Sequence, residues 1–423
     1  MAGRKRISRI AGTVLSATLA LCLTAPAVPA APSPYAPGSI APTADQALLD
    51  RALAEFYRQW KSIYLREGCG ESRVLVRTDG DGKPTLGGSA KATITVSEAH
   101  GYGMLATVMM ADVDPEAHRL FDGMLRFFHD HPARSDPGLM AWNQVAGCTD
   151  AGGDVGGSNS ATDGDLDIAY ALLLAERRWG NDGAFDYGAE ARRVLTAILA
   201  LEVHQPGPIL LIGDWAKTGD DATYAATTRS SDFMLSHFAA FADRTGDRRW
   251  LDLRNAIYAV IEIVGATYSP GTGLMPDFIV GLPDKPKPAP GGFLEGDYDG
   301  AYSWNAARYP WRVGLDFLLT GDERARQALR PLNAWAKKVT KGKPERFADT
   351  YLLSGKPAPD TRRNQMAFVS MLAVSAMIDA DNRDWLDALW AAMEKKPVAE
   401  EDYFGNTLKL MAMIAVTGHW VRP

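Results

Sequence analysis

Apolar residues recur along most of the chain at spacings of three and four residues, a pattern typical of helices that bury one face. About twelve segments follow it. They are 43–66, 97–112, 115–131, 163–179, 186–204, 229–244, 247–265, 302–319, 322–339, 361–379, 382–394 and 402–417. Strand-like alternation is confined to residues 72–96, around a glycine-rich turn. The pattern therefore predicts an all-α fold with a small β excursion near 72–96.

Short turns such as Thr245-Gly246-Asp247 and Thr320-Gly321-Asp322 join several of these segments. Short connections make consecutive helices antiparallel, so we expect six helical hairpins arranged around a common axis. The loops at one end of such a toroid would form a cleft. The longest irregular stretches are 132–160 and 269–300, and loops of that length are usually functional or disordered. Both are rich in Gly, Pro, Asp and aromatic residues, so we expect the chemistry there.

The first thirty residues differ from the rest of the chain. Four basic residues precede an apolar run from Ile10 to Leu23, and small residues follow up to Ala30. This order predicts a secretory signal over 1–30, because the run is shorter than the roughly 20 residues of a membrane span. Residues 31–43, rich in Ala, Pro and Ser, are expected to form a flexible leader, and 44–423 a single domain. We expect a secreted, extracellular monomer without membrane contact in its mature form.

Composition and charge narrow the possible partners. The chain has 423 residues, 46% of them hydrophobic, which is enough for a large core. Without residues 1–30 it keeps 41 Lys and Arg against 51 Asp and Glu, a formal balance of −10. An acidic chain is a poor ligand for nucleic acid, because phosphates are bound by clustered Lys and Arg. Cys69 and Cys148 remain, and the sequence leaves open whether they pair or stay as thiols.

The first candidate motif is Val96-Ser97-Glu98-Ala99-His100-Gly101-Tyr102-Gly103-Met104. Ser97 suits an N-cap, which places Glu98 in the first turn of a helix, where a carboxylate ordinarily only stabilises the dipole. Gly101 and Gly103 weaken a helix, so we expect them to let a bulky ligand approach the backbone. A proton donor at Glu98 would need burial or a neighbouring carboxylate to raise its pKa.

The second candidate motif begins at Ser160 and places three aspartates within five residues, from Asp163 to Asp167. Ser160 with Asp163 resembles a capping box, but three aspartates exceed what capping requires. Asp163 and Asp167 would lie on one face, one helical turn apart. A calcium loop is the competing interpretation, and it lacks the central glycine and the downstream glutamate. We therefore expect no metal here.

The run from Ala161 to Trp179 is similar to the signature of glycoside hydrolase family 8. Ser97-Glu98 with Gly101-Tyr102-Gly103-Met104 resembles that family's general-acid motif, and Tyr302–Arg312 resembles its third motif. The three occur in the family's order, and the resemblance extends from about residue 45 to the C-terminus. It implies an (α/α)6 barrel, inversion at the anomeric carbon, no metal and no cofactor.

The resemblance also implies roles for individual residues. Glu98 would protonate the leaving oxygen, Asp163 would hydrogen-bond the sugar at the point of cleavage, and Arg308 would lie in the same cleft. Many members have Asp as general base where this chain has Asn305, and an amide cannot take a proton from water. The chain thus resembles the subgroup whose base lies on an upstream loop, here 281–300. We assign the base to Glu295.

Asp297 and Asp299, on the same loop, are the rivals of Glu295 as base. An inverting enzyme needs its acid and base roughly 6.5–9.5 Å apart, and a loop across the cleft from a helix-borne acid can provide that separation. Asn305 would then help to orient the attacking water. Because sugar faces stack on aromatic rings, the candidate platforms are Trp142, Trp215, Tyr302 and Trp304.

The sequence thus predicts an endo-acting, inverting hydrolase of a β-1,4-linked polysaccharide. The resemblance leaves β-glucan, cellulose derivatives and chitosan open as substrates, with xylan a weaker candidate. One rival is a carbohydrate-binding protein that has lost catalysis on the same scaffold. Another is a polysaccharide lyase on a similar toroid, which would use a Tyr or His base.

Overall fold

The computed structural model describes residues 1–3, 34–83, 93–152, 155–204, 207–217 and 222–423. The expected signal over 1–30 therefore lies outside the described residues, apart from its first three positions. Residues Pro32–Pro423 form one compact unit. No helix within the described ranges is long and apolar enough to cross a membrane.

Twelve helices of at least eleven residues lie in the described parts of the chain, one in each expected helical segment. They are α1 (Gln46–Tyr64), α2 (Ser97–Met109), α3 (Ala117–Asp130), α4 (Thr162–Trp179), α5 (Tyr187–Leu201), α7 (Leu235–Thr245), α8 (Arg249–Tyr268), α9 (Tyr309–Thr320), α10 (Glu323–Thr340), α11 (Met366–Ala376), α12 (Arg383–Lys395) and α13 (Tyr403–Val416). A further short helix, α6, covers Ala222–Ala225.

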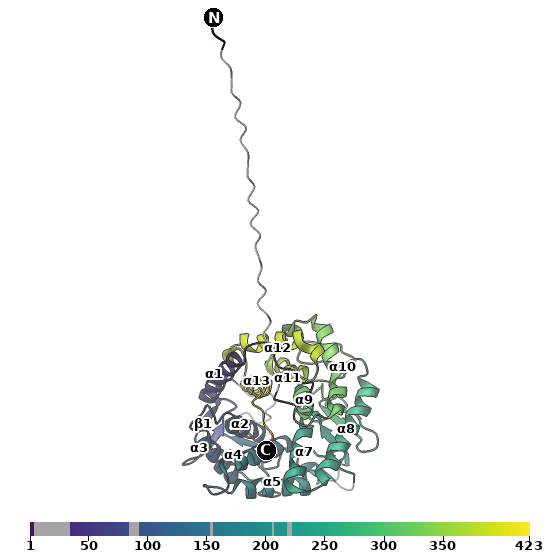
Figure 1. The fold of residues 1–423 in the computed structure, drawn as a ribbon. Helices are drawn as coiled ribbons and strands as arrows, with labels where there is room; N and C mark the ends of the chain where they lie inside the picture. The colour runs from purple at the N-terminus through teal and green to yellow at the C-terminus, as the bar shows by residue number, and fades with distance from the viewer. Residues whose placement is uncertain (4–33, 84–92, 153–154, 205–206, 218–221) are drawn as a thin grey trace. The chain divides into compact units, whose positions relative to one another are not determined.

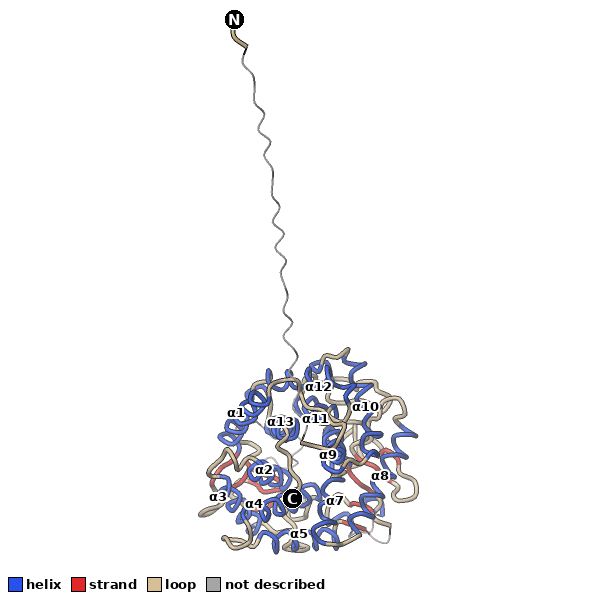
Figure 2. The backbone as a smooth tube through the Cα atoms, viewed as in Figure 1, coloured by secondary structure: helices blue, strands red, loops and turns tan. Residues whose placement is uncertain are grey.

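Six of these helices form a closed inner ring, in the order α2, α4, α7, α9, α11 and α13, with α13 contacting α2 again. The other six, α1, α3, α5, α8, α10 and α12, pack outside the ring (Figures 1 and 2). Helices of the inner ring are more deeply buried than helices outside it. All eleven residues of α11 are buried, whereas α10 buries only six of its eighteen. The fold is the expected (α/α)6 barrel.

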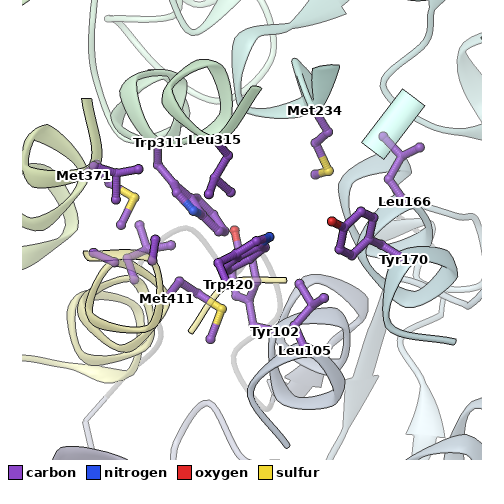
Figure 3. Close-up of a cluster of buried hydrophobic side chains, with 14 of the residues drawn as sticks. Tyr102, Leu105, Leu166, Tyr170, Met234, Trp311, Leu315, Met371, Met411 and Trp420 are labelled. Carbon is purple, nitrogen blue, oxygen red and sulfur yellow. The ribbon is translucent and has the colours of Figure 1, made fainter. Parts of the chain in front are cut away.

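Large aromatic and aliphatic side chains fill the barrel axis (Figure 3). Tyr102, Tyr170 and Trp311 point inward from three inner helices, and Trp420 enters between them from the C-terminal segment. The rings of Trp311 and Trp420 meet edge to face with centroids 5.6 Å apart. Because the axis is packed in this way, an open site can lie only at an end of the barrel, where the connecting loops gather.

Four small sheets lie among the connections of the described residues. They are β1 (Leu65–Glu67) with β2 (Val74–Val76), β3 (Thr93–Val96) with β4 (Asn143–Val145) and β5 (Thr149–Asp150), β6 (Val203–His204) with β7 (Ile209–Leu210), and β8 (Thr227–Arg229) with β9 (Phe278–Val280) and β10 (Lys287–Pro288). The expected β excursion over 72–96 contains β2 and β3, which belong to different sheets; residues 84–92 between them lie outside the described residues.

Two expected boundaries were wrong for a physical reason. The segment 229–244 was expected to be helical throughout, but its helix begins at Leu235 because β8 pairs with β9. The flexible leader expected over 31–43 is instead bound to the barrel from Tyr35 onward. The Tyr35 hydroxyl donates to the carbonyl of Ala415. The backbone amide of Ile40 donates to the carbonyl of Met377 at 2.8 Å.

The sequence left open whether the two cysteines outside residues 1–30 pair or stay as thiols. Cys69 and Cys148 form a disulfide, with Cα atoms 5.5 Å apart. Cys69 lies in the turn between β1 and β2, and Cys148 lies in the turn between β4 and β5. The bond therefore fixes the long 132–160 connection to the edge of the barrel near α2.

We predict that the double substitution Cys69→Ser and Cys148→Ser lowers the free energy of unfolding by about 4 kcal/mol, because a cross-link between residues so far apart in sequence restricts the unfolded chain strongly. Urea denaturation of the two proteins measures this difference. A reducing agent should destabilise the wild type by a similar amount and leave the double variant unchanged. Equal stability of wild type and variant would contradict the prediction.

Candidate functional site

The first turns of α2 and α4 lie unusually close together because glycine occupies the contact on each helix. A Cβ added at Gly101 would lie 2.8 Å from the Cβ of Asp167, and one at Gly164 would lie 2.6 Å from the hydroxyl of Ser97. The expectation that Gly101 serves the approach of a ligand was therefore wrong: it serves the approach of a neighbouring helix. This contact brings the carboxyl groups of Glu98 and Asp163 to one place.

Neither expected N-cap exists. Val96 and Ala161 occupy the cap positions of α2 and α4, and neither helix has a side-chain cap hydrogen bond. The Ser160 hydroxyl instead donates to Glu202 at 2.5 Å. The amide of Ser97 donates to the carbonyl of Trp142, and the amide of Gly164 donates to the carboxylate of Asp163 at 3.0 Å, a hydrogen bond that favours its negative charge.

Arg308 is the buried centre of the site. Its Nη1 donates to the carboxylate of Glu98 and, at 3.0 Å, to that of Asp163. Its Nη2 donates to the side-chain oxygen of Asn305 at 2.7 Å. One guanidinium therefore joins α2, α4 and the turn that precedes α9.

Asn305 extends this hydrogen-bonded chain to the loop that carries Glu295. With its oxygen occupied by Arg308, the Asn305 amide nitrogen donates to Oε2 of Glu295 at 2.8 Å. Glu98 and Glu295 are thus linked through only two side chains. Their surroundings differ: 16% of the Glu98 side chain is exposed, against 50% of the Glu295 side chain.

The two rivals of Glu295 occupy different positions on the loop. The buried carboxylate of Asp299 accepts the backbone amides of Leu294, Glu295 and Gly296 at 2.7, 3.1 and 3.0 Å, so it shapes the turn. The side chain of Asp297 lies exposed at the loop surface. Of the three acids, Glu295 is the one that accepts a hydrogen bond from the side chain of Asn305, the partner of Arg308.

A second buried cation, Arg229, was not expected from the sequence. It ends β8, with 12% of its side chain exposed. Its guanidinium lies 3.0 Å from Asp163, 3.2 Å from Asp232 and 4.0 Å from Glu295. The only sequence signal was the polar run Thr227–Asp232 ahead of an apolar helix, which we interpreted as part of that helix.

Burial and charge give these carboxyl groups different proton affinities. Burial raises the pKa of Glu98 to about 7, against the opposing charge of Arg308, and the nearby carboxylate of Asp163 adds to the rise. Burial alone would raise the pKa of Asp163 too, but the charges of Arg229 and Arg308 outweigh it and hold that pKa below its usual value. Burial raises the pKa of Asp232 to about 6. Glu98 is therefore partly protonated near pH 7, whereas Asp163 is ionised there.

Two further polar residues support the site from behind. Asp167, one turn below Asp163, pairs with Arg312 at 2.5 Å and with His237 at 3.0 Å, all three being buried. Asp277 is also buried, and its carboxylate accepts the backbone amides of Ser303 and Ala306. Asp277 thereby fixes the turn that carries Asn305 and Arg308.

The expected aromatic platforms divide into two groups. Tyr302 is completely buried between Phe347 and Phe368, so its ring has no free face, contrary to expectation. The other three are only partly buried. They are Trp142, Trp215 and Trp304.

Two of these tryptophans, Trp142 and Trp215, are connected to elements that carry Glu98 and Glu295. The carbonyl of Trp142 accepts the amide of Ser97 at 3.0 Å, at the start of α2. Trp215 packs on Tyr224, which contacts Phe293 of the Glu295 loop.

Trp304 is connected to Arg308 through the ring of Phe404. The guanidinium of Arg362 lies 4.9 Å from its ring centroid, and Phe404 packs against it at 6.0 Å. The guanidinium of Arg308 lies 5.6 Å from the centroid of the Phe404 ring. Phe404 was not expected from the sequence, because it lies in the helical pattern of α13, where an aromatic ring ordinarily belongs to the core.

Three buried carboxyl groups lie under the 132–160 connection. Asp165 accepts the amide of Met140 at 2.8 Å, and Asp214 accepts that of Ser160 at 2.9 Å. Glu202, the third, accepts the hydroxyl of Ser160 at 2.5 Å. Burial raises the pKa of Glu202 to about 8, and the carboxylate of Asp214 adds to that rise. Burial also raises the pKa of Asp165 well above its ordinary value, and Glu202 adds to that rise.

The arrangement as a whole can perform acid–base chemistry on a bond held between two carboxyl groups. Glu98 is placed to give a proton and Glu295 is exposed enough to take one from water. In the described ranges, no group of three His, Cys, Asp or Glu side chains is placed to hold a metal ion.

Comparisons with known proteins agree with this chemistry. A family model described as Glycosyl hydrolases family 8 matches residues 43–418. A β-glucanase of Niallia circulans is 39% identical over 89% of the chain and 86% of the relative. An endoglucanase of Bacillus sp. (strain KSM-330) is 34% identical over 89% of the chain and 78% of the relative. The apo structure of a β-1,3-1,4-glucanase from Paenibacillus sp. X4 superposes with a TM-score of 0.84 at 38% identity, covering 92% of this chain and 97% of that one.

We predict that the protein loses stability as the pH rises from about 4.5 to about 8. The folded pKa of Glu202 lies above its unfolded value of 4.5, so this stabilisation is complete below about pH 4.5 and is lost through about pH 8. The loss should be on the order of 3 kcal/mol between pH 5 and pH 8.

Thermal unfolding of wild type and Glu202→Gln at several pH values measures this effect. The amide cannot ionise, so the variant should lose less stability than the wild type over the same range. Parallel profiles for the two proteins would show that the buried acids do not control the pH dependence.

Proposed function

The chain belongs to glycosyl hydrolases family 8 and is an O-glycosyl hydrolase, and from that premise we propose that it cleaves β-1,4 bonds within β-glucan chains, with inversion at the anomeric carbon. What supports the mechanism is the link from Glu98 through Arg308 and Asn305 to Glu295. Inversion requires room for a water molecule between the base and the sugar, and the two intervening side chains hold the proposed acid and base apart.

Glu98 acts as the general acid in this proposal. Its carboxyl group is largely buried and has a pKa of about 7, so a protonated fraction is present near neutral pH. It gives its proton to the glycosidic oxygen as the bond to the anomeric carbon breaks. The ionised Asp163, 3.0 Å from Arg308 and from Arg229, accepts hydrogen bonds from the sugar at the point of cleavage.

Glu295 acts as the general base. Its half-exposed carboxylate takes a proton from a water molecule, whose oxygen then bonds to the anomeric carbon on the face opposite the leaving group. Asn305 cannot serve as base, because an amide does not accept a proton at neutral pH. Its amide donates to Glu295 and so fixes the direction of that carboxylate. This assignment places the chain in the subgroup whose base lies on a loop.

We propose a neutral β-glucan, including mixed-linkage β-1,3-1,4-glucan, as substrate. The relatives named β-glucanase, endoglucanase and β-1,3-1,4-glucanase support this choice. The N-terminal sequence of residues 1–30 supports secretion.

We predict that Glu98→Gln and Glu295→Gln each lower kcat on lichenan by about 10²–10⁴-fold, because each removes one proton transfer from the transition state. A reducing-end assay measures the loss. Asp297→Asn is the matched control on the same loop and should keep near-native turnover. Near-native turnover of Glu295→Gln would overturn the assignment of the base. Proton NMR of the first-formed product should show the α-anomer, and a β-anomer would exclude inversion.

We predict an alkaline limb near pH 7 in the pH profile of kcat/KM. Glu98 must be protonated to act, so activity should fall as the pH rises through its pKa of about 7. Asp163→Asn removes a negative charge that raises this pKa, so the alkaline limb of that variant should move to lower pH. A limb that stays in place in Asp163→Asn would show that another group controls it.

A further inference from the structure

Arg229 carries a buried positive charge that the proposed acid, base and sugar contacts do not use. Its three guanidinium nitrogens face three different carboxylates. Nε lies 3.2 Å from Asp232, Nη2 lies 3.0 Å from Asp163, and Nη1 lies 4.0 Å from Glu295. One cation thus serves as the shared counter-charge of acids from α4, from the turn before α7 and from the loop across the site.

We propose that Arg229 is a positioning residue for the proton acceptor: held by Asp232, its guanidinium draws Glu295 toward Asp163 and favours the ionised form of Glu295. This inference rests on the proposed function, because it concerns the acceptor of that reaction. It assigns to Arg229 a part in the chemistry that acts through Glu295 rather than on the sugar.

The backbone fixes the two partners to one scaffold. Arg229 ends β8 directly opposite Phe278 of β9. The amide of Phe278 donates to the carbonyl of Asp299 at 2.9 Å, and the side chain of Asp299 holds the amide of Glu295. The separation of Arg229 from Glu295 is therefore set by paired strands and a hydrogen-bonded turn.

The distance itself suits an acceptor. Oε2 of Glu295 is occupied by the amide of Asn305, which leaves Oε1 facing Arg229 at 4.0 Å. That separation is within the range of an ion pair but too long for a direct hydrogen bond. The positive charge thus stabilises the carboxylate while Oε1 keeps its lone pairs for a proton from water.

Removal of Arg229 would change the charge around both reacting groups. Without Arg229, the negative charges of Asp163 and Asp232 would no longer be balanced by its positive charge, and they would oppose a negative charge on Glu295. Arg229 is also among the cations that lower the pKa of Glu98 against the larger effect of burial. Loss of its charge should therefore favour the protonated form of both Glu295 and Glu98.

The test compares the pH profile of kcat/KM on lichenan for wild type, Arg229→Gln and Arg229→Lys. We expect both limbs of Arg229→Gln to move to higher pH by about one unit, since a neighbouring opposite charge shifts a carboxylate by about that much. Arg229→Lys keeps the charge, so its limbs should stay close to those of the wild type although kcat falls. Limbs that stay in place in Arg229→Gln would overturn the proposal.

Arg254→Gln is the matched control. Arg254 is as buried as Arg229, with 10% of its side chain exposed, and it pairs with Asp316 between outer and inner helices. Loss of this cation should reduce stability and leave both limbs in place. If Arg254→Gln moved the limbs as Arg229→Gln does, the effect would be one of general destabilisation and the proposal would be wrong.

Asp232→Asn tests the same idea should Arg229→Gln fail to fold. Asp232 has a pKa of about 6, so its negative charge is present mainly above that pH. Its removal leaves Arg229 free to act on its other neighbours, and the alkaline limb should move to lower pH, opposite to Arg229→Gln. An alkaline limb that moves upward or stays in place in Asp232→Asn contradicts the proposal.

Failure of the inference can be distinguished from failure of the proposed function. If the wild type releases no reducing ends, the proposed function is wrong. If the wild type is active and Glu295→Gln retains the acidic limb, the base is wrong. If Glu295→Gln abolishes activity while the limbs of Arg229→Gln stay in place, only the positioning role of Arg229 is wrong.

Discussion

The buried guanidinium of Arg308 is the interaction on which the site depends. An isolated buried charge costs several kcal/mol, and that cost is offset only by partners held in good geometry. Here the partners come from three separate elements: Glu98 from α2, Asp163 from α4 and Asn305 from the turn before α9. These elements meet only because the inner ring of helices closes. The packing that stabilises the barrel and the geometry that defines the site are therefore the same constraint.

Burial, more than charge balance, explains why one acid in this cluster has a raised pKa. Two Asp–Arg pairs lie one helical turn apart, Asp167 with Arg312 below and Asp163 with Arg308 above. The lower pair is buried and pairs one acid with one cation. Around the upper pair, Glu98 and Asp232 bring the buried acids to three, against Arg308 and Arg229. Burial raises the pKa of Glu98, the carboxylate of Asp163 adds to the rise, and the charges of Arg308 and Arg229 only partly oppose it.

Much of this could be predicted from the sequence, because helical periodicity and short turns are local signals. The twelve segments and the ring of hairpins follow from patterns within single elements, whereas Glu98, Asp163 and Arg308 were assigned to the site through the resemblance of three motifs to glycoside hydrolase family 8. What was missed depends on contacts between distant residues. Arg229 ends a strand that exists only because β9, some fifty positions later, pairs with it. Tyr302 is buried by Phe347 and Phe368, which no local pattern places beside it.

The hydrogen bonds of Asn305 with Arg308 and Glu295 explain why an amide suits this position better than an acid. A carboxylate at that position could accept from Arg308 but has no N–H to donate to Glu295. An amide accepts from Arg308 with its oxygen and still donates to Glu295 with its nitrogen. In the proposed mechanism the acceptor then lies on a loop, half in contact with solvent, while the donor stays buried. Two carboxyl groups of identical chemistry take opposite roles in it, because burial favours holding a proton and exposure favours taking one.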